Sequence, residues 1–386
     1  MAENKLKEMK FSNFLKAVNR EEGAYVPTAI NDSTGSIAWA GKKTIDVVQN
    51  PQEYVETMTG IYDQMWADVA LVNGVVYSKK LEEAFLHVEN KYGPDGVTLE
   101  HVQLSPMQKD EYDQLIADPN RFVSEVLLPR KYPEFFEDRE FARNALKVYA
   151  EDNFHVLVIL SSMLKQTLED KYGIVSVVNA LERIQTPLDI LFDYFRGFRG
   201  TLTDLRRQPA NVKAALDAIW EVHCLPKENT PYTGSFPYSW QPPHIPCCLS
   251  PKQYDELYWV HEKPMIERYI ANGGKHYFIM EGKWDKIWDR FRELPKDSLI
   301  LHVDDDNIIQ AKKEIGDWQI IAGGLKLADC RLKTFDQIKD DIKRVVDECA
   351  PGGGFIFTLD KAALAPGDIN QTVIDAYNFV HEYSSK

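Results

Sequence analysis

Apolar and polar positions follow a repeated pattern over the last hundred residues of the chain. Short apolar runs occupy residues 275–281, 298–303, 318–323 and 354–359, and each precedes a segment with helical apolar spacing. Strand–helix units in series require a parallel sheet with its helices outside. The pattern therefore predicts the α/β class and a (β/α)8 TIM barrel, in which residues after each strand carry the chemistry.

The first half of the chain predicts the remaining strands less regularly. An N-terminal helix covers about the first twenty residues. Strand candidates follow at residues 24–30, 67–73 and 153–160. A long helical insertion, residues 74–152, separates the second strand from the third. No linker composition divides the chain, so we expect a single domain over residues 1–386.

Two segments between the early strands and the repeats lack this pattern. Residues 186–209 combine apolar positions with four arginines, which either bind an anion or pair with nearby aspartates. Residues 230–249 are rich in proline and aromatic side chains, and a loop of this length in a compact domain is usually functional. We expect it to form a lid or substrate wall that includes Tyr238, Trp240 and His244.

Composition narrows the class of protein. The net charge of −14 argues against nucleic-acid binding. The charged N-terminal segment does not resemble a secretory signal, and no apolar stretch reaches the roughly 18 residues of a membrane helix. The five cysteines are odd in number and fit no disulfide or zinc spacing. We therefore expect reduced thiols and a cytoplasmic protein.

Polar residues at the expected strand ends are the candidate catalytic groups. Glu281 follows one strand, and enclosure by aromatic side chains would raise its pKa and make it an acid; the alternative is a solvated carboxylate. His302 and Asp304 end the next strand and, at strand spacing, project to the same face. The sequence therefore predicts a catalytic group of Glu281, His302 and Asp304.

Other strand-end residues are candidates for substrate contacts. Asn31 and Asp32 follow the first strand, and Asn73 ends the second. Asp360 and Lys361 end the last strand, although Lys361 could instead pair with Asp360 or Asp368. The glycines Gly323 and Gly324 either leave room for a ligand or form a plain turn.

Six segments, in order along nearly the whole chain, resemble those of one enzyme superfamily. They are EYDQLIADPNRFVSEVLLPR (111–130), FRGFRGTLTDLRRQP (195–209), LSPKQYDELYWVHEKP (249–264), IMEGKWDKIW (279–288), IIAGGLKLADCRLKT (320–334) and GGGFIFTLDKAALAPGDIN (352–370). Together they resemble the uroporphyrinogen decarboxylase superfamily, which implies a (β/α)8 barrel. The arginine-rich segment that binds porphyrinogen is replaced by NREEGAYVPTAIN at residues 19–31, which argues against a tetrapyrrole substrate.

The same resemblance bears on zinc. Members of the superfamily that use zinc carry an H-x-C-G segment and a distant second cysteine. In this chain Ile279 stands at the histidine, Glu281 at the first cysteine and Lys361 near the second. Zinc is therefore disfavoured, and any metal site would have to use Glu281, His302 and Asp304.

The segments at residues 111–130 and 195–209 look most like the first methyltransferase of O-demethylase systems. That resemblance implies transfer of a methyl group from an aryl methyl ether to cob(I)alamin on a separate corrinoid protein. The enzyme would need a hydrogen-bond donor for the departing phenolate, because a phenol has a pKa of about 10. Assembly into a homodimer is compatible with the sequence.

Three alternatives stay open. A decarboxylase of a small or tetrapyrrole acid would need a carboxylate-binding arginine, such as Arg196 or Arg199. A methylcobalamin-dependent methyltransferase could deliver the methyl group to another acceptor. A barrel that only binds a ligand is disfavoured by the polar residues at five strand ends.

Overall fold

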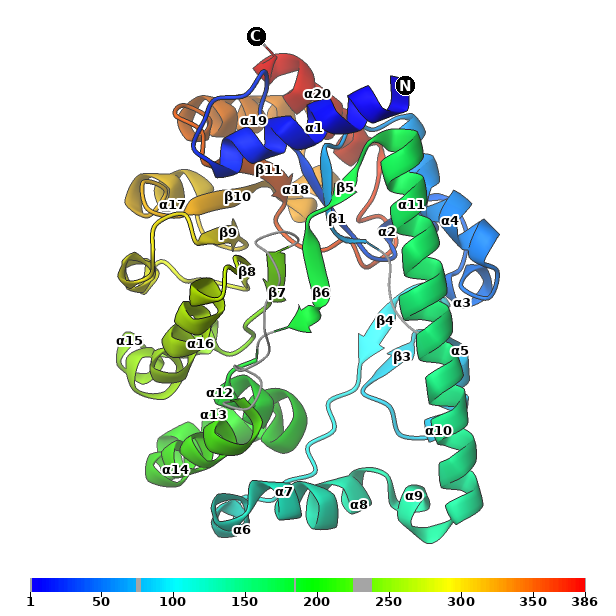
Figure 1. The fold of residues 1–386 in the computed structure, drawn as a ribbon, viewed down its shortest axis with the longest axis vertical. Helices are drawn as coiled ribbons and strands as arrows, with labels where there is room; N and C mark the ends of the chain where they lie inside the picture. The colour runs from blue at the N-terminus through cyan, green and yellow to red at the C-terminus, as the bar shows by residue number, and fades with distance from the viewer. Residues whose placement is uncertain (1, 74–77, 184, 225–237, 386) are drawn as a thin grey trace.

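The computed structural model shows a mixed α/β protein with parallel sheets (Figure 1). It describes residues 2–73, 78–183, 185–224 and 238–385. The side chains of residues 2–4, 72–73 and 179–183 lie outside the description. No helix in these ranges is long and apolar enough to span a membrane.

The strands are short, and outside the hairpin at residues 90–101 most of their described side chains are buried. They are β1 (Ala29–Asp32), β2 (Val69–Asn73), β3 (Asn90–Tyr92), β4 (Leu99–His101), β5 (Val175–Ser176), β6 (Val178–Arg183), β7 (Tyr238–Gln241), β8 (His276–Met280), β9 (Leu299–Val303), β10 (Ile320–Leu325) and β11 (Phe355–Leu359).

Helices fill the segments between the strands. In the first half these are α1 (Ala2–Val18), α2 (Gly35–Trp39), α3 (Thr44–Val47), α4 (Pro51–Thr59), η1 (Gly60–Asp63), α5 (Lys79–Phe85), α6 (Tyr112–Ala117), α7 (Pro119–Phe122), η2 (Val123–Leu127), α8 (Leu128–Lys131), α9 (Pro133–Glu137), α10 (Arg139–Asn153), η3 (Phe154–Leu160) and α11 (Ser161–Tyr172). In the second half they are α12 (Pro187–Ile190), η4 (Leu191–Arg196), α13 (Gly197–Arg207), α14 (Pro209–Ile219), η5 (Trp220–Cys224), η7 (Pro246–Cys248), α15 (Pro251–Gln253), η8 (Tyr254–Trp259), α16 (Val260–Ala271), η9 (Trp288–Glu293), α17 (Ile308–Glu314), α18 (Leu327–Leu332), α19 (Phe335–Cys349) and α20 (Gln371–Ser384).

Parallel pairing connects strands along most of the chain. One sheet has the order β1-β2-β5, and a second runs from β6 through β7, β8, β9 and β10 to β11. Val177 joins the two, because its N–H donates to Ala70 O (2.9 Å) and its carbonyl accepts from Tyr238 N–H (2.8 Å). Parallel bridges from Thr28 to Phe357 and from Asp32 to Ala363 connect the first strand to the last.

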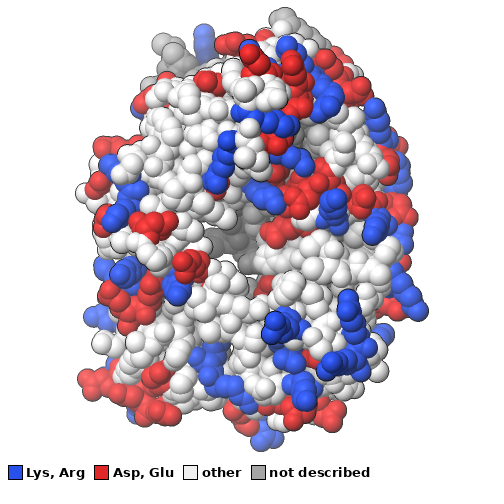
Figure 2. Space-filling view, turned by 180° about the vertical axis from the view of Figure 1, so that it is seen from behind, with Lys and Arg blue, Asp and Glu red and all other residues white. Residues whose placement is uncertain are grey.

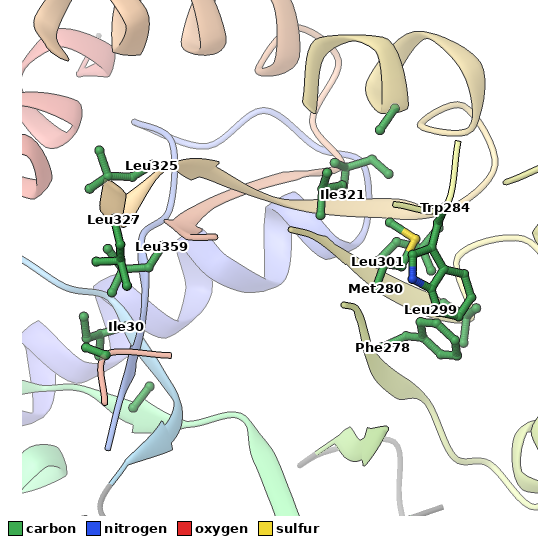
Figure 3. Packing of buried hydrophobic residues seen from close by; sticks show 14 of the residues in the cluster. Ile30, Phe278, Met280, Trp284, Leu299, Leu301, Ile321, Leu325, Leu327 and Leu359 are labelled. Atoms are coloured by element: carbon green, nitrogen blue, oxygen red, sulfur yellow. The ribbon is translucent and has the colours of Figure 1, made fainter. Parts of the chain in front are cut away.

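Strand side chains alternate between two apolar clusters, as a period of two requires. The larger cluster, between strands and helices, contains Phe278, Met280, Leu299 and Leu301 (Figure 3). The smaller cluster lies on the other face of the strands and is here called the inner cluster. Its strand members are Ala29, Val69, Leu71, Val178, Tyr238, Tyr277, Ile279, Ile300, Ile320, Ala322 and Ile356.

Helix α1 covers one end of the inner cluster. Phe14 and Val18 belong to that cluster, and the ring of Phe14 meets Tyr238 edge-on at a centroid distance of 6.5 Å. Tyr238 begins β7, so α1 packs at the amino ends of the strands. The carboxyl ends of the strands therefore lie at the opposite edge, away from α1.

The four C-terminal strand predictions are confirmed as β8 to β11, whereas three earlier predictions need correction. Residues 153–160 were expected as a strand but continue a helix from α10 through η3 into α11, and the third strand is β5–β6 instead. The first strand begins at Ala29, past Pro27, which cannot donate to a ladder. The predicted loop at residues 230–249 contains β7.

The insertion after β2 is more varied than a set of helices. It contains the antiparallel hairpin of β3 and β4, with Asn90 opposite His101. Residues 74–77 and 225–237 lie outside the described ranges. Helix α13 packs on the insertion through Gly197, whose added Cβ would lie 2.0 Å from Ser105 Oγ.

Candidate functional site

Three loops meet where parallel strands end. Asp304 follows β9, and its Oδ2 accepts a hydrogen bond from the Gly282 N–H that follows β8 (2.9 Å). Its Oδ1 lies 3.1 Å from Nζ of Lys361, which follows β11. Lys361 also lies 3.3 Å from Asp305. These contacts hold the loops after β8, β9 and β11 together.

His244 lies between two carboxylates from different elements. Its Nδ1 is 2.9 Å from one oxygen of Asp193 and 3.0 Å from the other. Its Nε2 is 3.8 Å from Oε1 of Glu281. The structure thus brings together Glu281 and His244, which were predicted in different roles. Asp193 was not predicted as a site residue; it is one of the aspartates near the arginines of residues 186–209.

The electrostatics of this group favour a charged imidazole. Burial disfavours the charged form of His244, but the hydrogen bond to Asp193 and the charge of Glu281 outweigh it and raise its pKa to about 9. Burial raises the pKa of Glu281, and Asp304 adds to the increase while His244 opposes it. At neutral pH the group therefore holds a proton on His244 Nε2, directed toward Glu281.

An aromatic row crosses three adjacent strands on the inner face. Trp240 and Tyr277 pair in register, and their rings stack with an interplanar angle of 8° and centroids 6.0 Å apart. The Tyr277 hydroxyl lies 3.1 Å from His302 Nδ1. Trp240 is partly exposed, whereas Tyr277 and His302 are fully buried.

The prediction that His302 acts beside Asp304 needs correction. The Nε2 of His302 lies 2.8 Å from Leu359 O, so both ring nitrogens have protein partners. Burial lowers the pKa of His302 to about 4 and keeps the ring neutral. Strand β9 ends at Val303, so Asp304 belongs to the loop and turns toward Gly282 and Lys361. His302 is a buried core residue below the site.

Asp360 and Lys361, which follow the last strand, also lie at this end of the strands. Asp360 is buried and its Oδ1 accepts from Leu327 N–H (3.0 Å), with a pKa raised by burial and by Asp304. Lys361 pairs with Asp304 and Asp305 rather than with Asp360 or Asp368. Helix α17 is capped by Asn307, so the aspartates after β9 are not its N-cap.

Polar residues predicted as substrate contacts end the first two strands. Asn31 and Asp32 are both buried, and Asp32 Oδ1 accepts from Ser36 N–H (3.2 Å). Burial raises the pKa of Asp32 to about 6. Asn73 pairs in register with Asp32, but its side chain lies outside the described part of the structure. The prediction of Tyr238 as substrate wall is wrong, because its ring packs against α1 at the other end of the strands.

Two further predictions are decided by close contacts. Arg196 Nε lies 2.7 Å from Asp204 Oδ2, so the paired alternative holds for this arginine. Gly323 and Gly324 lie within β10, not after it. A Cβ on Gly323 would lie 3.0 Å from Val303 O, and one on Gly324 would lie 3.1 Å from Val345. These glycines therefore permit close packing of β10 against β9 and α19.

The metal alternative finds no support among the described residues. No group of three or more His, Cys, Asp or Glu side chains there could hold a metal ion. Glu281, His302 and Asp304 do not converge as ligands, because His302 is already bonded through both nitrogens. Ile279 belongs to the inner cluster, and Lys361 is ion-paired.

The molecule is hollowed near the centre of the face turned away from the view of Figure 1, and acidic side chains lie on its rim (Figure 2). Figure 1 places the end of β6 near the middle of the molecule at the same height.

A scan against models of protein families gives no match to this chain, and a search of curated proteins gives none either.

Proposed function

We propose that this chain is a (β/α)8-barrel methyltransferase that removes the methyl group of an aryl methyl ether and passes it to cob(I)alamin on a separate corrinoid protein. The barrel is supported by the parallel pairing within the two sheets, by Val177 between them, and by the bridges from Thr28 to Phe357 and from Asp32 to Ala363. Such a barrel presents its chemistry at the carboxyl ends of its strands, where Glu281, Asp304 and Asp360 lie.

The observation that carries the proposal is the placement of His244 between Asp193 and Glu281. Demethylation breaks the bond between the methyl carbon and the ether oxygen, and the electron pair stays on that oxygen. A protonated His244 Nε2 can donate to the departing phenolate, while Asp193 holds Nδ1 and stabilises the imidazolium. Glu281, 3.8 Å from Nε2, can relay a proton from solvent when His244 is protonated again.

The corrinoid, carried by the partner protein, would supply the nucleophile that receives the methyl group. The residues of this chain would orient the donor and control the proton. Trp240, partly exposed at the edge of the aromatic row, offers a face on which an aromatic ring can stack. No step in this scheme needs a protein-bound metal.

The decarboxylase alternative has weaker support. Arg196 is engaged by Asp204 and by Met107 O (3.4 Å), and Arg199 is exposed on α13. His244 and Lys361, which lie after β7 and β11, are both paired with carboxylates. A substrate carboxylate that used either group would have to displace that pair.

The direct test mixes the purified chain with cob(I)alamin and 2-methoxyphenol. We expect the absorption spectrum of methyl-Co(III) to appear together with free catechol, in equal amounts. A sample without the chain controls for spontaneous transfer. Absence of both products with a panel of methoxyarenes, combined with carbon dioxide release from a carboxylic acid, would favour the decarboxylase. Methyl transfer from methylcobalamin to another acceptor would favour the second alternative.

A further inference from the structure

Asp189, on α12, is a buried carboxylate with an unusual number of partners. It is 4% exposed. Its Oδ1 accepts from the backbone N–H groups of His244 (3.2 Å) and Ile245 (3.4 Å). Its Oδ2 accepts from the hydroxyls of Tyr258 (2.5 Å) and Thr186 (3.1 Å). One oxygen thus holds the segment after β7, and the other is fixed by side chains.

A buried network adjoins Asp189 through Tyr258, whose hydroxyl also hydrogen-bonds to Glu262. Glu262 of α16 accepts from the Tyr254 hydroxyl (2.7 Å) and from Gln241 Nε2 at the end of β7 (2.9 Å). Tyr254, Tyr258 and Glu262 are fully buried. Because buried polar groups are costly unless bonded, this network fixes α12, β7 and the η8–α16 helix relative to one another.

Asp189 and Asp193 reach His244 from the same helix. They are four residues apart on the continuous helix of α12 and η4, so both carboxylates face the same side. Asp189 holds the backbone of His244, and Asp193 holds its ring. The two contacts together determine where Nε2 lies, and Glu281 lies 3.8 Å from it.

We propose that Asp189 is a positioning residue, which anchors the backbone of His244 so that the imidazole spans Asp193 and Glu281. The role of His244 as a proton donor rests on the proposed function, whereas the anchoring does not. The titratable groups that face or adjoin His244 are Asp189 and Asp193 on α12–η4, Glu281 after β8, and Cys247 on η7.

The test is Asp189→Asn in the full chain, with two readouts that do not depend on activity. The first is the pKa of His244, followed by NMR of 13C-labelled histidine and assigned with His244→Gln. We expect a decrease of about one unit, because a nearby negative charge is removed. The second is hydrogen exchange of the His244 and Ile245 amides, which we expect to become at least about tenfold faster.

Asp217→Asn is the matched control, because Asp217 is an exposed carboxylate that pairs with His261 (3.4 Å) and Lys213 (3.0 Å). It should leave both readouts unchanged. Tyr258→Phe is a second variant, which removes one donor to Asp189 and keeps the backbone contacts. We expect a smaller shift of the same sign in the pKa of His244.

A folded Asp189→Asn protein with the wild-type pKa and exchange rates would overturn the proposal. If Asp189→Asn does not fold, unchanged readouts in Tyr258→Phe would overturn it as well. Failure of the proposed function has a different signature. In that case wild-type protein transfers no methyl group, while the two readouts still respond to Asp189→Asn.

Discussion

The imidazole of His244 lies between carboxylates that reach it from a helix and from the end of a strand. Asp193 is within hydrogen-bond distance, whereas Glu281 is 3.8 Å away. The contact to Asp193 fixes the ring, and the longer gap to Glu281 leaves Nε2–H accessible to a substrate oxygen. At the scale of single residues, this asymmetry is the basis of the proposed chemistry.

Replacing His244 tests that role. His244→Gln keeps a polar side chain but cannot carry the proton, so we expect methyl transfer to fall by about 10²–10⁴-fold, as for loss of a general acid. The loss should shrink for a methyl donor whose phenol is acidic, because its phenolate needs less help to leave. Rates with 2-methoxyphenol and 4-nitroanisole measure the difference. An equal loss for both donors would contradict the role.

The raised pKa of His244 also predicts a pH dependence of stability. A histidine whose pKa rises on folding, here to about 9, stabilises the folded state fully below its unfolded pKa near 6.5. That contribution disappears as the pH rises through about 9. We therefore expect the free energy of unfolding to fall between pH 6.5 and 9 more steeply in wild type than in His244→Gln. Urea titrations at several pH values measure it, and parallel curves would contradict it.

His302 has the opposite character and predicts a purely structural effect. Its ring nitrogens contact the Tyr277 hydroxyl and Leu359 O in a fully buried place. His302→Ala would leave both partners unpaired, so we expect a loss of about 1–3 kcal/mol per unpaired group in the free energy of unfolding. His101→Ala, on the surface hairpin, should cost little. Equal effects in urea unfolding would show that His302 is not a bonded core residue.

At the scale of elements, the helix that carries Asp193 ends in a close contact with the insertion. Gly197 has φ 72° and ψ 170°, a backbone conformation that only glycine adopts readily. Gly197 follows η4 directly. Its close approach to Ser105 therefore fixes the end of the helix whose Asp193 contacts the ring of His244. Sequence alone showed the glycine but not the partner, which lies far away along the chain.

Two glycine-to-alanine variants compare the loss of stability at a crowded position with positive φ and at an open one. Gly197→Ala should destabilise the fold by more than the roughly 1–3 kcal/mol of its backbone conformation alone, because the new Cβ would lie 2.0 Å from Ser105 Oγ. Gly41→Ala has a similar φ of 71° but nothing within 4 Å of the added Cβ. Thermal unfolding of both measures the difference. Equal decreases in Tm would argue against the close contact.

The helix at residues 153–160 illustrates why one element was predicted wrongly. Its sequence is a nearly continuous apolar run, which is compatible with a buried strand. In the structure Val156 and Leu160 are buried, while Phe154 and Val158 are 60% and 47% exposed. The buried residues Val156 and Leu160 are four positions apart, as on one face of a helix. The sequence could not show that the apolar side chains of Phe154 and Val158 are exposed to solvent.

At the scale of the whole molecule, the regular C-terminal strands were predictable and the site was predictable only in part. Strands β8 to β11 follow from apolar runs with clear boundaries, so Glu281, Asp304 and Asp360 could be placed at strand ends. The partners of His244 could not, because Asp189 and Asp193 come from a helix about fifty residues earlier. Such contacts depend on tertiary packing rather than on local pattern.

Shortening the chain tests how the first and last strands depend on each other. A chain ending at Gly354 lacks β11 and α20, and it loses the parallel bridge between Thr28 and Phe357. The exposed edges of β1 and β10 would then be open to other chains, so we expect aggregation in size-exclusion chromatography. A chain ending at Ser384 should elute as wild type. A folded, non-aggregating protein ending at Gly354 would contradict this dependence.

The meeting of Thr28 with Phe357 has a consequence for synthesis. While the polypeptide is being made, Thr28 is synthesised more than three hundred residues before Phe357, its partner in β11. The edge of the first strand stays open over that stretch of synthesis, and nascent-chain chaperones would have to shield it until β11 is available.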